Sequence, residues 1–174
     1  MFCIYRYINL ISKNYAMTKV KPIPEGYHSL VPYITVKDAA SAIEFYKKAF
    51  NAKEIGRLSM PDGKIGHAEL QVGDSRFMLA EEMPEWGNKS PQSLGGTPVG
   101  MCLYVEHVDA AYKQAISAGA KVDKDMEPQD QFYGDRSGSL IDPFGHRWVI
   151  STHIEDVSFA EMQIRMNKLF EKKD

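Results

Sequence analysis

Cysteine is scarce in this 174-residue chain, which has only Cys3 and Cys102. Neither belongs to a CxxC pair, and two cysteines this far apart do not suggest a disulfide framework. Such a chain is typical of a protein kept in a reducing compartment. We therefore predict a cytoplasmic location.

An excess of positive charge is also missing, since 21 Lys and Arg are set against 23 Asp and Glu and the net charge is -2. No sequence-wide basic field is available to hold a phosphate backbone, so we expect no nucleic-acid partner. No apolar run reaches the roughly 20 residues of a membrane-spanning helix, so we expect no membrane partner. Hydrophobic residues at 44% and charged residues at 25% are typical of a globular domain.

The sequence has no GxSxG, P-loop, Rossmann or HExxH motif and no triad signature around a Ser or Cys. These absences argue against several common classes of hydrolase, nucleotide-binding protein and zinc protease. Cys102 has no charged neighbour in the sequence that would lower its pKa, which leaves a nucleophilic role without support.

The first half of the chain predicts a strand, a helix and three further strands. Ala39, Ile43, Tyr46 and Phe50 recur at helical spacing in AASAIEFYKKAFN, and Gly73-Asp74 marks a hairpin. The strands are expected at residues 27–36, 53–60, 65–72 and 76–81.

The same order then repeats, with a helix at 108–118 and strands at 100–106, 121–127, 134–141 and 146–153. Val36 and Val105 match at an offset of 69 residues, and Ala52-Lys53 matches Ala120-Lys121 at an offset of 68. One such unit cannot bury its own sheet face. We therefore predict an α+β fold in which tandem βαβββ modules form a concave mixed sheet with outer helices.

These patterns divide the chain into three parts. Residues 1–25 form an N-terminal extension, of which 1–16 is read as an arm or a small partner-docking helix. Residues 26–155 form one domain, made of a module at 26–82, a linker at 83–98 and a module at 99–155. Residues 156–174 carry a terminal helix whose apolar side packs on the sheet or on a dimer partner.

The amino-acid sequence of three segments resembles that of the vicinal oxygen chelate superfamily. This superfamily includes glyoxalase I, bleomycin-resistance proteins, fosfomycin-resistance enzymes and extradiol dioxygenases. The segments are PYITVKDAASAIEFYKKAF, GHAEL, and GDRSG followed by DPFGHRW. They look like the PhnB-like, glyoxalase-related branch, and the resemblance covers about residues 26–155. It implies a homodimer.

In metal-dependent members, the resemblance implies metal ligands at four positions, which here are Val31, Glu69, Gly100 and Val149. Only Glu69 has a side chain that can coordinate a metal, whereas a catalytic divalent site usually needs about three protein ligands. We therefore predict no cofactor. A bound Zn, Ni, Mn or Fe ion is the alternative.

Strand alternation places His67, Glu69 and Gln71 on one face of their strand. Such residues can form a ligand clamp, a partial metal site, a catalytic pair of Glu69 and His67 for proton transfer, or only a polar patch on a half-exposed strand.

Arg136 is the expected cationic counterpart across the cup, because a guanidinium can bind a carboxylate or phosphate through two hydrogen bonds. An internal pair with Asp135 or Asp142 is the alternative. Tyr33 and Tyr104 are expected to line the cup from their strand positions. Trp86 in the linker either folds over the cavity mouth or simply packs.

The sequence is compatible with three functions. The leading prediction is a metal-independent protein that binds a polar or anionic small molecule in the sheet cup. The alternatives are a metal-dependent lyase or transferase of the glyoxalase type, and a non-catalytic interaction module.

Overall fold

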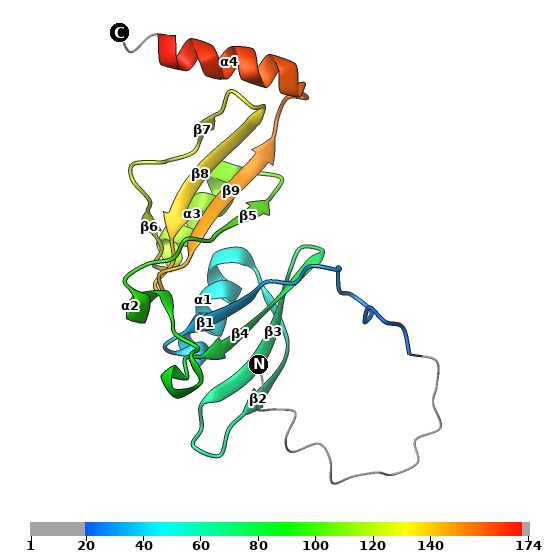
Figure 1. Ribbon diagram of the computed structural model, residues 1–174, viewed down its shortest axis with the longest axis vertical. Helices are drawn as coiled ribbons and strands as arrows, with labels where there is room; N and C mark the ends of the chain where they lie inside the picture. Colours follow the sequence, from blue (N-terminus) through cyan, green and yellow to red (C-terminus); the bar gives the residue numbers. More distant parts are fainter. Residues whose placement is uncertain (1–19, 172–174) are drawn as a thin grey trace.

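The repeated module of the sequence is visible in the computed structural model, which describes residues 20–171 (Figure 1). The first module contains β1 (Tyr33–Val36), α1 (Ala39–Phe50), β2 (Lys53–Ser59), β3 (Ile65–Val72) and β4 (Ser75–Glu81). The linker contains η3 (Pro84–Trp86) and α2 (Pro91–Leu94). The second module contains β5 (Gly100–Tyr104), α3 (Val108–Ala118), β6 (Lys121–Val122), β7 (Gln129–Asp130), β8 (Asp135–Ile141) and β9 (Arg147–His153), and α4 (Phe159–Glu171) follows it.

Each module forms its own mixed sheet. The strand order is β1-β4-β3-β2 in the first sheet and β5-β9-β8-β6 in the second, where β7 also pairs with β8. In each module the first strand pairs in parallel with the last, β1 with β4 and β5 with β9. The other strand pairs are antiparallel. The predicted α+β fold with tandem modules is therefore confirmed. Figure 1 shows the two sheets one after the other along the long axis, with α1 and α3 packed together near the middle.

Two predicted strands are shorter than expected, for local reasons. The strand predicted at 27–36 begins only at Tyr33, because residues 24–27 form a turn in which the Tyr27 amide donates to the Pro24 carbonyl. The strand predicted at 121–127 ends at Val122. Lys124 and Asp125 have φ values of 51° and 58°, in the left-handed region that interrupts a strand.

Helix α1 begins and ends where its sequence predicts. Asp38 caps the start by accepting a hydrogen bond from the Ser41 amide, and Asn51 ends the helix in the left-handed conformation. The stripe that contains Ile43, Tyr46 and Phe50 is buried.

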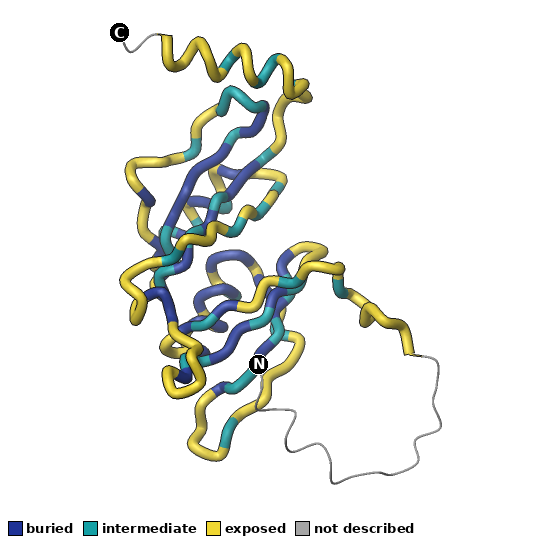
Figure 2. The backbone as a smooth tube through the Cα atoms, viewed as in Figure 1, coloured by how far each residue is buried: buried dark blue, intermediate teal, exposed yellow. Residues whose placement is uncertain are grey.

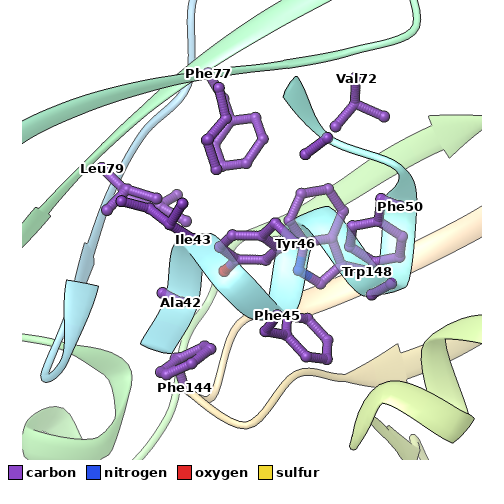
Figure 3. Packing of buried hydrophobic residues seen from close by; sticks show 14 of the residues in the cluster. Ala42, Ile43, Phe45, Tyr46, Phe50, Val72, Phe77, Leu79, Phe144 and Trp148 are labelled. Carbon is purple, nitrogen blue, oxygen red and sulfur yellow. The ribbon is translucent and has the colours of Figure 1, made fainter. Parts of the chain in front are cut away.

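An aromatic cluster joins the two modules (Figure 3). The ring of Trp148 on β9 lies 4.7 Å from that of Phe50 on α1 and 5.9 Å from that of Phe77 on β4. Phe144, in the turn between β8 and β9, lies 6.0 Å from the ring of Phe45. The DPFGHRW motif thus supplies the second module's half of a shared core.

Buried Asp142 ties this core together. One carboxylate oxygen accepts hydrogen bonds from the Tyr46 hydroxyl at 2.7 Å and the Trp148 indole at 3.0 Å. The other oxygen accepts the backbone amides of Phe144 and His146, each at 2.9 Å. Burial against this carboxylate raises the pKa of Tyr46 well above 10. Four donors around one buried carboxylate offset the cost of removing it from water.

Helix α4 lies at one end of the molecule and buries none of its residues (Figure 2). Arg165 holds it to the body through two hydrogen bonds to Glu155, both at 2.7 Å. The helix itself is confirmed, but within one chain its apolar side does not pack on a sheet, and Phe159 is 89% exposed.

The predicted arm at 1–16 lies outside the described residues. Among residues 20–171, no helix is long and apolar enough to cross a membrane. The cytoplasmic location stays a prediction.

We expect Asp142→Asn to destabilise the joint between the modules. An amide cannot accept at all four positions, so the free energy of unfolding should fall by about 2–4 kcal/mol, measured by urea unfolding. Glu85→Gln on the surface is the control and should change it by less than about 0.5 kcal/mol. Equal stability of both variants would contradict the role of Asp142.

Candidate functional site

One face of the first sheet is covered by α1, and the other is open and carries polar side chains. On β3, Ala68 and Leu70 are buried in the core, and the alternating residues His67, Glu69 and Gln71 are half-buried on the open face. The predicted alternation on this strand is confirmed.

A chain of hydrogen bonds links residues on this open face. His67 Nε2 lies 3.3 Å from a Glu69 carboxylate oxygen, and the Tyr33 hydroxyl lies 3.2 Å from His67 Nδ1. The other Glu69 oxygen accepts the hydroxyl of Tyr27. All three bonds are satisfied when Tyr33 donates to Nδ1 and the Nε2–H donates to Glu69.

Arg76 on β4 supplies the cation of this face. Its guanidinium carbon lies 4.8 Å from the centre of the Tyr27 ring, and its positive charge acts on Glu69. We refer to Tyr27, Tyr33, His67, Glu69 and Arg76 as the first-sheet cluster. Tyr27 and Arg76 were not among the predicted site residues. The hairpin at Gly73-Asp74 could have identified Arg76, because it fixes the register that places Arg76 opposite Gln71.

The cluster shifts the ionisation of its own members. The hydrogen bond from Tyr27 is the main cause that lowers the pKa of Glu69, with further contributions from His67 and Arg76. Desolvation and the neighbouring carboxylate raise the pKa of Tyr27, and desolvation raises that of Tyr33. Near neutral pH, the face therefore presents an ionised carboxylate beside a guanidinium and neutral phenols.

The prediction that Arg136 faces Glu69 across the cup is wrong. Arg136 lies on the helix-covered side of the second sheet, where it donates to Asp109 of α3 at 2.7 and 2.8 Å and to Asp130 at 2.9 Å. It shares strand parity with Gly138 and Leu140, which are buried under α3. The alternative partners, Asp135 and Asp142, are not its partners either.

Two further candidates, Gln71 and Trp86, make no hydrogen bond to the first-sheet cluster among the described residues. Gln71 lies on the same face, but its amide donates to the Gly73 carbonyl of its own hairpin at 3.0 Å. Trp86 lies in η3 of the linker and is 51% exposed.

The open face of the second sheet carries a separate polar group. Buried Asp135 accepts the Tyr104 hydroxyl at 2.7 Å through one oxygen, and its other oxygen lies 2.7 Å from His153 Nδ1. His153 Nε2 lies 3.1 Å from a carboxylate oxygen of Asp156. We call Tyr104, Asp135, His153 and Asp156 the second-sheet cluster.

Of these four residues, only Tyr104 was predicted as a site residue. The bond to Asp135 raises the pKa of Tyr104 to about 12. Desolvation, with a smaller effect of Asp135, raises the pKa of the neighbouring Cys102 thiol, which therefore stays protonated near neutral pH. Strand parity alone could have grouped Tyr104 with Cys102, but the contact to Asp135 joins strands far apart in the sequence.

The residues at the four family metal positions do not fit a divalent ion. Val31, Gly100 and Val149 offer no side-chain donor, and both Glu69 oxygens are already engaged. Within residues 20–171, no group of three His, Cys, Asp or Glu side chains is arranged to hold a metal ion. Metal independence stays a prediction.

The second-sheet cluster predicts a pH-dependent contribution of His153. Asp135, and to a lesser degree Asp156, raises the pKa of His153 above 6.5. Its protonated form therefore stabilises the folded protein fully below about pH 6.5, and this contribution is lost as the pH rises through the higher folded-state value.

An NMR titration of the His153 imidazole should show its pKa falling toward 6.5 in Asp135→Asn. The fall should be smaller in Asp156→Asn, because Asp156 is fully exposed. An unchanged pKa in Asp135→Asn would contradict the assigned hydrogen bond.

Known proteins resemble this chain over most of its length. An uncharacterised protein of Mycobacterium bovis is 46% identical over 142 residues, which are 80% of this chain and 92% of that protein. The X-ray structure of an Arabidopsis thaliana gene product superposes with a TM-score of 0.57 at 26% identity, covering 72% of this chain and 98% of that one. The fosfomycin resistance protein FosX of Listeria monocytogenes, solved with Mn(II) and sulfate, shares the fold at 20% identity and a TM-score of 0.54, covering 80% of this chain and 97% of that one.

The matching family model spans residues 26–150, which include the first module, the linker and the second module as far as Ile150 in β9. Together with the shared fold, this match shows that the chain belongs to the Glyoxalase/Bleomycin resistance protein/Dioxygenase superfamily.

Proposed function

We propose that the protein binds a small polar or anionic molecule on the first-sheet cluster, without a metal. The observation that carries this proposal is the placement of Glu69 and Arg76 on the same open sheet face, where both contact Tyr27. A half-buried carboxylate and guanidinium side by side can bind a ligand's donor and its acceptor at once.

The surroundings of these two groups favour a ligand over a purely structural patch. The Glu69 side chain is 25% exposed and that of His67 is 27% exposed, so both are accessible yet partly shielded from water. Arg76 Nε is buried and has no hydrogen-bond partner among residues 20–171. A buried donor without a partner is costly, and an acceptor from a ligand would remove that cost.

We also propose that the functional unit is a homodimer. Within residues 20–171, no hydrogen bond joins the first-sheet cluster to the second-sheet cluster. Aromatic residues on both open faces are exposed, Tyr33 at 56% and Tyr104 at 60%. In a twofold dimer, the open face of the first sheet in one copy can pack against the open face of the second sheet in the other copy. The symmetry repeats this contact, so both open faces of each copy are covered. The exposed apolar side of α4 adds surface that a second copy can cover.

A binding experiment tests the ligand proposal. Inorganic phosphate, benzoate and phthalate are screened by thermal shift, and the anion that stabilises the protein most is titrated by calorimetry. Arg76→Met should weaken its binding by about 10- to 150-fold, because a hydrogen bond to a charged group is lost. Glu69→Gln should strengthen it, because a like charge is removed from the site.

Arg136→Met is the matched control, because it removes a guanidinium that the structure places on the opposite side of a sheet. Its affinity for the anion should equal that of the wild type. If all four proteins bind equally, or if none of the anions binds the wild type, the first-sheet cluster does not bind anions.

The dimer is tested by light scattering at micromolar concentration. We expect twice the mass of one 19.7 kDa chain. The mass of a single chain would contradict the homodimer.

A further inference from the structure

A turn at residues 24–27, before β1, places the side chain of Tyr27 in the first-sheet cluster. The Tyr27 amide donates to the Pro24 carbonyl at 3.2 Å, and Gly26 between them has a φ of 79°. A Cβ at Gly26 would lie 2.5 Å from Arg76 Nη2, so only glycine permits this close approach without a shift. The backbone of Gly26 therefore packs directly against the Arg76 guanidinium.

Tyr27 engages both charged groups of the cluster. Its hydroxyl donates to Glu69, and Arg76 lies over its ring. Around it, residues 20–32 are exposed except for Tyr27 and Val31, which are half-buried (Figure 2). At its end next to β1, Pro32 accepts a hydrogen bond from the Met78 amide of β4 at 2.8 Å. Residues 20–30 are exposed except for Tyr27, so lifting them away exposes little apolar surface.

We propose that Tyr27 is an internal occupant of the binding face and that the ligand is a small hydroxylated aromatic molecule that takes its place. This inference rests on the function proposed above and names its ligand class. The ligand's hydroxyl would donate to Glu69 and its ring would lie against Arg76, as those of Tyr27 do.

The chemistry of the face selects such a molecule. A phenol is a stronger hydrogen-bond donor than an aliphatic alcohol, and its bond to an ionised carboxylate is charge-assisted. The guanidinium attracts the face of an aromatic ring. Tyr33 and His67, packed edge to face with ring centroids 5.6 Å apart, place a further aromatic surface beside Glu69.

Because Tyr27 is tethered to the same chain, it competes with any free phenol. A tethered group acts at an effective concentration in the millimolar range. Ligand affinity is therefore reduced in the wild type, and removal of the Tyr27 side chain should restore it.

The experiment uses Tyr27→Ala and 4-methylphenol, which is the tyrosine side chain as a free molecule. Toluene, which lacks the hydroxyl, is the matched ligand, and binding is followed by amide NMR shifts. Tyr27→Ala should bind 4-methylphenol at least about tenfold more tightly than toluene, and several-fold more tightly than the wild type does.

The double variant Tyr27→Ala, Glu69→Gln should lose most of the preference for 4-methylphenol over toluene. The shifts should lie on β3 and β4 beside Glu69 and Arg76. Circular dichroism checks that each variant is folded, which we expect because Tyr27 lies outside the core.

Equal binding of 4-methylphenol and toluene by folded Tyr27→Ala would overturn the ligand class. Equal binding of 4-methylphenol by wild type and Tyr27→Ala would overturn the internal occupancy. Either result leaves the broader proposal standing if anions still bind in an Arg76-dependent way. The broader proposal fails separately, by the loss of that dependence.

Discussion

The buried carboxylate of Asp142 is the constraint on which the arrangement of the two modules depends. It binds Tyr46 of the first module and Trp148 of the second through one oxygen, so the helix α1 and the strand β9 cannot shift independently. The same residue fixes the turn before β9 through the amides of Phe144 and His146. His146 then reaches back to the Thr35 carbonyl at 3.0 Å, which ties this turn to β1 as well. The members of both clusters other than Tyr27 and Asp156 lie on strands of the two sheets that this joint holds together.

The contacts of Asp142 lie on the helix-covered side of the sheets. The opposite face of each sheet is therefore not needed to hold the two modules together. Core residues such as Leu70, Leu79 and Ile150 alternate with residues that make no contribution to the joint. Substitutions of half-exposed residues on the open faces, such as Tyr33 and His67, therefore cost less stability than substitutions in the aromatic cluster, which open cavities. This separation is how one superfamily fold can carry different sites, and why membership alone does not name the ligand.

The sequence predicted the parts of the structure that depend on local spacing. The repeat of strand, helix and three strands, the helix face at Ile43 and Tyr46, and the alternation of His67 and Glu69 all follow from periods of 3.6 and 2. Arg136 was misplaced because a one-residue difference in parity moves a side chain to the other face of a strand, and nothing local in Gly134-Asp135-Arg136 reveals the register. Asp135 and His153 are 18 residues apart in the sequence and meet through the pairing of β8 with β9. No local pattern reveals that pairing.

Tyr27 shows a different limit of sequence reasoning. Its turn was read as part of a strand because aromatic and β-branched residues follow it, and the proximity to Glu69 spans 42 residues. Val31, Gly100 and Val149, where the resemblance implies metal ligands, have no side-chain donor. Polar groups lie elsewhere, at Tyr27 and Arg76 beside the first sheet and at Asp135 and His153 on the second. A carboxylate without metal partners would be poorly compensated on a half-buried strand, and here a phenol, an imidazole and a guanidinium compensate Glu69 instead. Hydrogen bonds therefore hold the Glu69 carboxylate in the folded chain, and Tyr27 is the donor on the oxygen that His67 does not contact.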